Sequence, residues 1–175
     1  GLPTWPDRSL LKALVGAGAW KAMFEGGCAC GAVRYRLTRR PMFVNCCHCH
    51  DCQRQCGAAF AINALIETAE IVVASGETVP SRMATDSGRV HDIHRCAACG
   101  TAMWSDYGGR PALRFVRVAT LDDPTALTPD AHIFTRSKLS WVEVTGAPAF
   151  EVYYDMQALW PVESLARRRA ILGDG

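Results

Sequence analysis

The sequence predicts a mainly β domain of many short strands, with helices at its two ends. Short runs of strand-forming residues, separated by glycine, proline and serine, recur through the central part of the chain. Closely spaced cysteines followed by glycine interrupt these runs and mark tight turns. Apolar residues at helical spacing stand out only near the two ends. The sequence contains no internal repeat and no glycine-rich phosphate loop.

The predicted strands follow one another from residue 32 onwards. Residues 32–37 alternate apolar side chains with Arg34 and Arg36, which is typical of a half-buried strand. Residues 112–120 form the longest β-like run, and a turn signal at 121–124 ends it. Further short runs with strand composition cover residues 60–65, 71–74, 80–84, 90–95, 102–105, 132–135, 141–144 and 151–154.

Helices are expected at both ends of the chain. Thr4 or Asp7 can cap a helix over residues 8–20 within an N-terminal extension of residues 1–22. Met23 fits a natural start, which would make that extension an added leader. At the other end, Pro161 opens a helix over 162–172. The expected division is therefore an extension (1–22), a central domain (23–150), and a C-terminal strand and helix (151–175) packed on that domain.

Composition and charge narrow the class of protein. The 175 residues are 49% hydrophobic and 21% charged, which is ordinary for a globular domain that does not need disulfides. The net charge of +2, with dispersed basic residues, gives no reason to expect a nucleic-acid partner. No apolar stretch is long enough to span a membrane. Many metal-type cysteines without a signal peptide predict a reducing, cytoplasmic location. The oligomeric state is left open.

Two cysteine pairs far apart in the sequence have the spacing of half-sites for one metal ion. Cys28 and Cys30 form the first pair, Cys96 and Cys99 form the second, and a glycine follows each pair. Together they predict a closed four-thiolate zinc site, which is usually structural. Such a site would join segments about 65 residues apart, where closing a long loop stabilises the fold.

The remaining five cysteines lie in residues 45–57. Cys47, Cys49 and Cys52 place three thiols within six residues, close enough to bind one zinc ion. Three protein ligands leave a position for water or substrate, which is typical of a catalytic zinc. Cys56, His50 or Cys46 could instead supply a fourth ligand and close the site.

Two other uses of the cysteines are disfavoured. The nine cysteines are an odd number, and C-x-C spacing makes strained disulfides. Iron–sulfur clusters rarely use a C-x-C pair with a distant C-x2-C pair.

An open zinc site with three thiolates favours thiol chemistry. Such a site carries a net charge of −1 before its fourth ligand, so it is a poor Lewis acid for water. It is better suited to holding a thiol as its thiolate, ready to make or break a bond between carbon and sulfur.

Three ordered motifs resemble the glutathione-dependent formaldehyde-activating enzyme family. They are G-G-C-A-C-G-A-V-R-Y at residues 26–35, C-H-C-H-D-C-Q-R at 47–54 and C-A-A-C-G at 96–100, followed by similar stretches at 120–124, 132–133 and 138–141. The resemblance implies an Mss4-like, zinc-stapled fold of short antiparallel sheets. It implies two zinc ions per chain, a structural one on the four-cysteine set and a catalytic one on the three-cysteine set.

The activity that the resemblance implies is that of a carbon–sulfur lyase. The enzyme would activate glutathione for reversible addition to formaldehyde, giving S-hydroxymethylglutathione. Two alternatives stay open: the same thiol chemistry on another small electrophile, or a non-catalytic zinc-stapled module that binds a protein.

Supporting roles are expected for several polar residues. His48 is the candidate for a catalytic role, because it could donate a hydrogen bond to a ligand sulfur or carry the thiol proton. The guanidinium of Arg54 could pair with a substrate carboxylate, unless it is a solvated surface arginine. Lys138 and Trp141 could shape a glutathione pocket, although we expect a tryptophan here to belong to the core.

Overall fold

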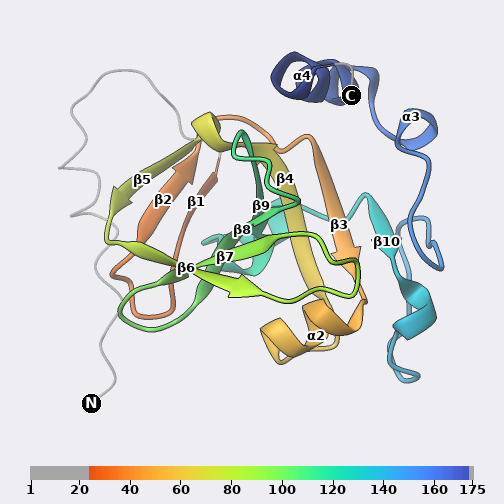
Figure 1. Ribbon diagram of the computed structural model, residues 1–175, viewed down its shortest axis with the longest axis horizontal. Coiled ribbons are helices and arrows are strands. Elements are labelled where there is room, and N and C mark those ends of the chain that lie inside the picture. The colour runs from red at the N-terminus through yellow and green to blue at the C-terminus, as the bar shows by residue number, and fades with distance from the viewer. Residues whose placement is uncertain (1–23, 174–175) are drawn as a thin grey trace.

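The computed structural model describes residues 24–173 (Figure 1). The helix expected over residues 8–20, and the N-terminal extension of residues 1–22, lie outside the described residues.

The described chain is mainly β, as the sequence predicted. Its ten strands are β1 (Phe24–Gly27), β2 (Arg34–Leu37), β3 (Phe43–Cys47), β4 (Ala61–Glu67), β5 (Ile71–Ser75), β6 (Thr78–Met83), β7 (His91–Cys96), β8 (Ala102–Tyr107), β9 (Leu113–Arg117) and β10 (Ala131–Ile133). Most of the predicted runs coincide with these strands to within a few residues.

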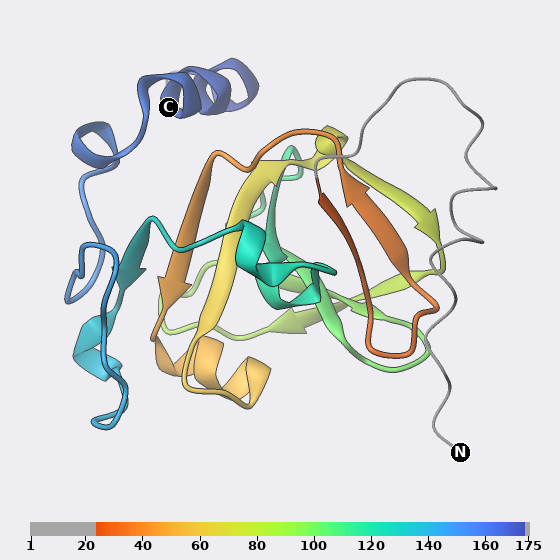
Figure 2. The same ribbon diagram turned by 180° about the vertical axis from the view of Figure 1, so that it is seen from behind.

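The strands form two sheets. A small sheet has the order β1-β2-β5, and a large sheet has the order β10-β3-β4-β9-β8-β7-β6. Every pairing between neighbouring strands is antiparallel except that of β10 with β3, which is parallel. Seen from both sides, the small sheet lies near one end of the molecule, and β10 lies at the opposite edge (Figures 1 and 2).

Within residues 24–173, three α-helices accompany the sheets: α2 (His50–Cys56), α3 (Met156–Leu159) and α4 (Val162–Leu172). The bounds of α4 agree with the prediction. Helix α2 was not predicted, because its sequence was interpreted as a tight metal-binding turn. It follows β3 directly and ends at Gly57, whose φ of 61° lies in the left-handed region that glycine favours.

Two predicted strands are absent. Residues 141–144 and 151–154 belong to no strand. The segment between them pairs with β10 only through a bridge between His132 and Ala149, with His132 donating to the Pro148 carbonyl at 2.8 Å and accepting from the Phe150 amide at 2.9 Å. Phe134 explains the short pairing. Its φ of 56° is incompatible with an extended strand, so the ladder cannot continue past Ile133.

Helix α4 is attached to the large sheet by polar contacts. Arg167 donates to both carboxylate oxygens of Glu67 at 2.8 and 2.6 Å and to the Arg40 carbonyl at 2.9 Å. Ser164 donates to the Met42 carbonyl at 2.7 Å. Burial raises the pKa of Glu67, but the hydrogen bonds from Arg167 and from its own backbone, together with the charges of Arg167 and Arg39, lower it below its usual value.

Replacing Arg167 with alanine is expected to lower the free energy of unfolding by about 2–4 kcal/mol at neutral pH, because a buried carboxylate loses its partner. The folded-state pKa of Glu67 is depressed, so the ion pair contributes fully above the unfolded pKa, about 4.3, and its contribution is lost at lower pH. Urea unfolding at neutral and acidic pH checks this. Equal midpoints for the variant and the wild type at neutral pH would contradict the assignment.

Candidate metal centres

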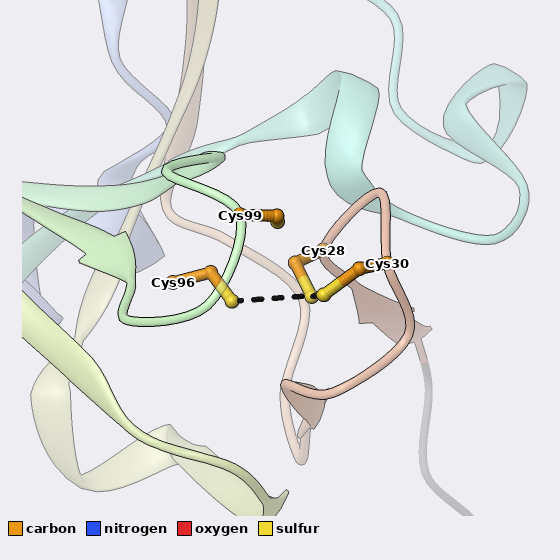
Figure 3. Close-up of side chains that lie close together, drawn as sticks. All are labelled: Cys28, Cys30, Cys96 and Cys99. Carbon is orange, nitrogen blue, oxygen red and sulfur yellow. Dashed lines mark hydrogen bonds between the residues drawn. The ribbon is translucent and has the colours of Figure 1, made fainter.

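The four-cysteine cluster is assembled from two turns. Cys28 and Cys30 follow β1, Cys96 ends β7, and Cys99 lies in the turn before β8. Figure 3 shows the four side chains converging from these two loops. All four sulfur atoms lie within 4.8 Å of one another, with 3.4 Å between Cys28 and Cys30 and 3.9 Å between Cys30 and Cys96.

The glycine after each pair closes its turn. Gly31 and Gly100 have φ of 77° and 73°, a conformation that other residues rarely adopt. The amide of Gly31 donates to the Cys28 carbonyl at 3.0 Å, and that of Gly100 donates to the Cys96 carbonyl at 2.9 Å. The two pairs therefore have the same local design.

These four sulfur atoms fit a zinc ion. Four thiolates bound tetrahedrally at 2.3 Å would lie about 3.8 Å apart, close to the separations in this cluster. The Val33 amide donates to Cys28 Sγ at 3.2 Å, and Thr101 Oγ1 lies 3.1 Å from Cys99 Sγ. Hydrogen bonds from Thr101 lower the pKa of Cys99 to about 6, so this thiol is predisposed to bind as a thiolate.

The three-cysteine cluster lies where β3 meets α2. Cys47 ends the strand, Cys49 is the N-cap of the helix, and Cys52 lies in its first turn. The Cys47 and Cys49 sulfur atoms are 3.4 Å apart, and all three lie within 4.8 Å of one another. The Cys52 amide donates to Cys49 Sγ at 3.4 Å. The unpredicted helix is therefore what brings the third thiol to the other two.

Cys49 is the thiol of this cluster that ionises most readily. Hydrogen bonds from the Cys47 and Cys52 thiols lower the pKa of Cys49 to about 2, whereas these same contacts and burial raise the pKa of Cys47. A metal ion, which binds thiolates, would ionise all three.

None of the alternative fourth ligands joins this cluster. In the described part of the chain, the group of mutually close donor atoms contains Cys47, Cys49 and Cys52 alone. Cys56 and His50 are exposed, and Cys46 belongs to a different group. The donor set therefore fits zinc with three protein ligands.

Arg117, at the end of β9, is a buried cation that the sequence analysis missed. Its side chain donates to Asn63 Oδ1 and to Gln55 Oε1 of α2. Only 6% of the residue is exposed, and its Nε has no hydrogen-bond partner among the described residues. No described carboxylate lies within ion-pair distance of it.

The three-cysteine cluster lies close enough to Arg117 for the two to interact electrostatically. The hydrogen bond with Cys47 lowers the pKa of Cys52, but Cys49 and burial together raise it by more, to about 12. The positive charge of Arg117 acts in the lowering direction. Burial and the charge of Arg117 also lower the pKa of His91, while Asp51 and Cys49 act in the opposite direction. A buried guanidinium is costly without an anion nearby, and ionised thiolates supply one.

Replacing Arg117 with methionine is therefore expected to weaken metal binding at the three-cysteine cluster by about tenfold or more, equivalent to about 1.4 kcal/mol of lost attraction. Competition with a chromophoric chelator measures the affinity. Arg54→Met, which removes an exposed arginine from α2, is the matched control. An unchanged affinity in a folded Arg117→Met protein would exclude Arg117 as the counter-ion.

The two predicted supporting residues lie in different surroundings. Arg54 is exposed on α2, where its guanidinium is accessible to a solute. His48 is fully buried, and its Nε2 lies 3.1 Å from His132 Nδ1 and 3.6 Å from Cys46 Sγ. These contacts include no sulfur of the three-cysteine cluster, so a catalytic role for His48 stays a prediction.

The loop after β10 lies beside the cluster. Gln53 of α2 donates to the carbonyls of His48 and Ser137, both at 2.8 Å. Lys138 donates to the carbonyls of Leu139 and Val142. Trp141 is 72% exposed, so the expectation that it belongs to the core is wrong.

Comparisons with known proteins place the chain in a family. The family model described as "Glutathione-dependent formaldehyde-activating enzyme" matches residues 23–137. A protein of Halomonas elongata with the curated name "Putative glutathione-dependent formaldehyde-activating enzyme" is 29% identical over 156 residues, covering 86% of this chain and 97% of that protein. A Rhodobacter sphaeroides protein of known crystal structure is 21% identical, with a TM-score of 0.47, over 72% of this chain and 99% of its own. The match over most of the chain shows that this protein belongs to the glutathione-dependent formaldehyde-activating enzyme family.

Proposed function

We propose that this protein is a zinc-dependent carbon–sulfur lyase that activates glutathione for reversible addition to formaldehyde, giving S-hydroxymethylglutathione. The observation that carries the proposal is the cluster of Cys47, Cys49 and Cys52, in which three sulfur atoms converge without a fourth side-chain donor among the described residues. The family and the curated name of the Halomonas relative support the same chemistry.

The proposal assigns one zinc ion to each cysteine cluster. The ion on Cys28, Cys30, Cys96 and Cys99 would be structural. The ion on the three-cysteine cluster would stabilise a substrate thiol in its deprotonated form. Cys47, Cys49 and Cys52 would hold that ion at the end of β3, and the positive charge of Arg117 would help to stabilise these thiols in their metal-bound, ionised form.

The reaction requires little beyond deprotonation and positioning. One carbon–sulfur bond forms between the thiol and the aldehyde carbon, and one proton moves from sulfur to the aldehyde oxygen. A positioned thiolate gains effective concentration over the reaction in solution. Arg54, exposed on α2 two residues after Cys52, would pair with a glutathione carboxylate.

The proposal also covers the domain bounds and the cellular location of the protein. We take residues 23–150 as the zinc-binding domain and 151–175 as a segment packed on it, in which Arg167 attaches α4. Nine cysteines without a disulfide among the described residues suit the reducing cytoplasm. No helix in the described part of the chain is both long and apolar enough to cross a membrane.

Thiol binding at the open cluster can be observed directly. Cobalt(II) in place of zinc reports its own coordination in the visible spectrum. Glutathione added to the cobalt-loaded protein should change the spectrum of the three-cysteine site and leave that of the four-cysteine site unchanged. Cys49→Ser should abolish the response. A spectrum that ignores glutathione would favour a closed site and a protein-binding module, whereas thiol binding without turnover of formaldehyde would point to another electrophile.

A further inference from the structure

A third group of metal-type donors lies outside both cysteine clusters. Cys46 Sγ is 3.6 Å from His48 Nε2, and His48 Nε2 is 3.1 Å from His132 Nδ1. All three donor atoms lie within 4.8 Å of one another. The three residues are buried, with exposed fractions of 1%, 0% and 8%.

Strand pairing brings these side chains together. Cys46 and His48 are two residues apart along β3 and its continuation, where the His48 amide donates to the Ile133 carbonyl at 3.0 Å. Side chains two apart on an extended chain share one face, and Cys47 between them faces the other way. His132 of β10 is the register partner of Cys46 in the parallel pair. The group therefore lies on the face of β3 opposite to Cys47.

The separations match those between the ligands of one zinc ion. With Zn–S of 2.3 Å and Zn–N of about 2.05 Å, tetrahedral geometry places sulfur about 3.6 Å from nitrogen and two nitrogens about 3.3 Å apart. His132 is also oriented as a ligand. Its Nε2 lies 3.3 Å from the Thr145 carbonyl, so Nε2–H donates there and leaves the Nδ1 lone pair to the group.

We propose that Cys46, His48 and His132 bind a third divalent transition metal ion, of the class that prefers mixed imidazole and thiolate ligands, such as zinc. Three protein ligands leave one position for water or a small ligand. The site is separate from the two cysteine clusters and does not depend on the proposed function.

The competing arrangement is a metal-free hydrogen bond in which His48 Nε2–H donates to His132 Nδ1. The Nδ1 of His48 has no partner among the described residues in either arrangement, so it does not separate them. The two arrangements differ in whether the loss of Cys46 lowers the amount of bound metal. Only a metal site needs its thiolate, because a hydrogen bond between two histidines forms without it.

Metal stoichiometry tests the site by difference. The full-length protein and its Cys46→Val variant are stripped of metal, reloaded with cobalt(II) or zinc(II), freed of excess ion and analysed by elemental mass spectrometry. The wild type should hold one equivalent more than Cys46→Val. Cys56→Val, at an exposed cysteine outside every cluster, should keep the wild-type content. Equal content in wild type and Cys46→Val overturns the proposal, whatever the other two sites hold.

The ligand type gives a second test that needs no variant. Both cysteine clusters offer only sulfur from the protein, so imidazole scattering in the zinc absorption spectrum would come from this site. Its presence in the wild type and its loss in His132→Gln support the site. Its absence from the fully loaded wild type overturns the proposal and leaves the proposed function untouched.

Discussion

Cys28→Ser is expected to shed one metal ion and to leave the protein largely unfolded. A structural zinc site contributes about 10–16 kcal/mol of apparent binding free energy, which exceeds the stability of most domains. Cys28 is also fully buried within the hydrophobic core between the sheets, so serine would bury a polar hydroxyl there in place of a metal-binding thiolate. Circular dichroism, thermal unfolding and metal analysis of the purified variant measure the effect.

Cys56→Ser is the matched control for this substitution. Cys56 is exposed at the end of α2, so its replacement should change neither the melting temperature nor the metal content. A Cys28→Ser protein that melts with the control would show that the four-cysteine cluster does not stabilise the fold.

Cys49→Ser is expected to leave the protein folded while abolishing activity. Cys49 is the N-cap of α2, and its sulfur accepts the Cys52 amide. Serine is among the best N-cap residues, so its hydroxyl can take over this hydrogen bond and keep the helix. The metal of the three-cysteine cluster loses one of its three protein ligands, so the rate of thiol addition should fall to the spontaneous rate.

The melting temperature separates this result from simple unfolding. Cys49→Ser should melt within a few degrees of the wild type, while Cys28→Ser should not. Equal destabilisation by the two substitutions would contradict the division into a structural and a catalytic centre.

Local signals in the sequence were enough to predict part of this architecture. Helix α4 has the predicted bounds because Pro161 and Gly173 flank a helical pattern. The two cysteine pairs were matched because each carries its own turn, with Gly31 and Gly100 in the left-handed conformation. These features depend on neighbours in the chain, which a single sequence displays.

The remaining features depend on tertiary contacts. Helix α2 was missed because its seven residues lack a readable apolar face, and a cysteine serves as its cap. In the sequence, Arg117 is indistinguishable from any other arginine in a strand. Its burial and its contacts with Asn63 and Gln55 appear only in the folded chain. His132 and Cys46 are brought together by the parallel pairing of β10 with β3, and the sequence of neither strand alone predicts that pairing.

The most direct measurement is the exchange rate between glutathione plus formaldehyde and S-hydroxymethylglutathione, followed by exchange NMR at equilibrium. Zinc-loaded wild-type protein should accelerate the exchange, and Cys49→Ser at the same concentration should leave it at the spontaneous rate. Acceleration that is lost with Cys49 would locate thiol activation at the three-cysteine cluster. A spontaneous rate in the presence of fully loaded wild-type protein would contradict the proposed activity.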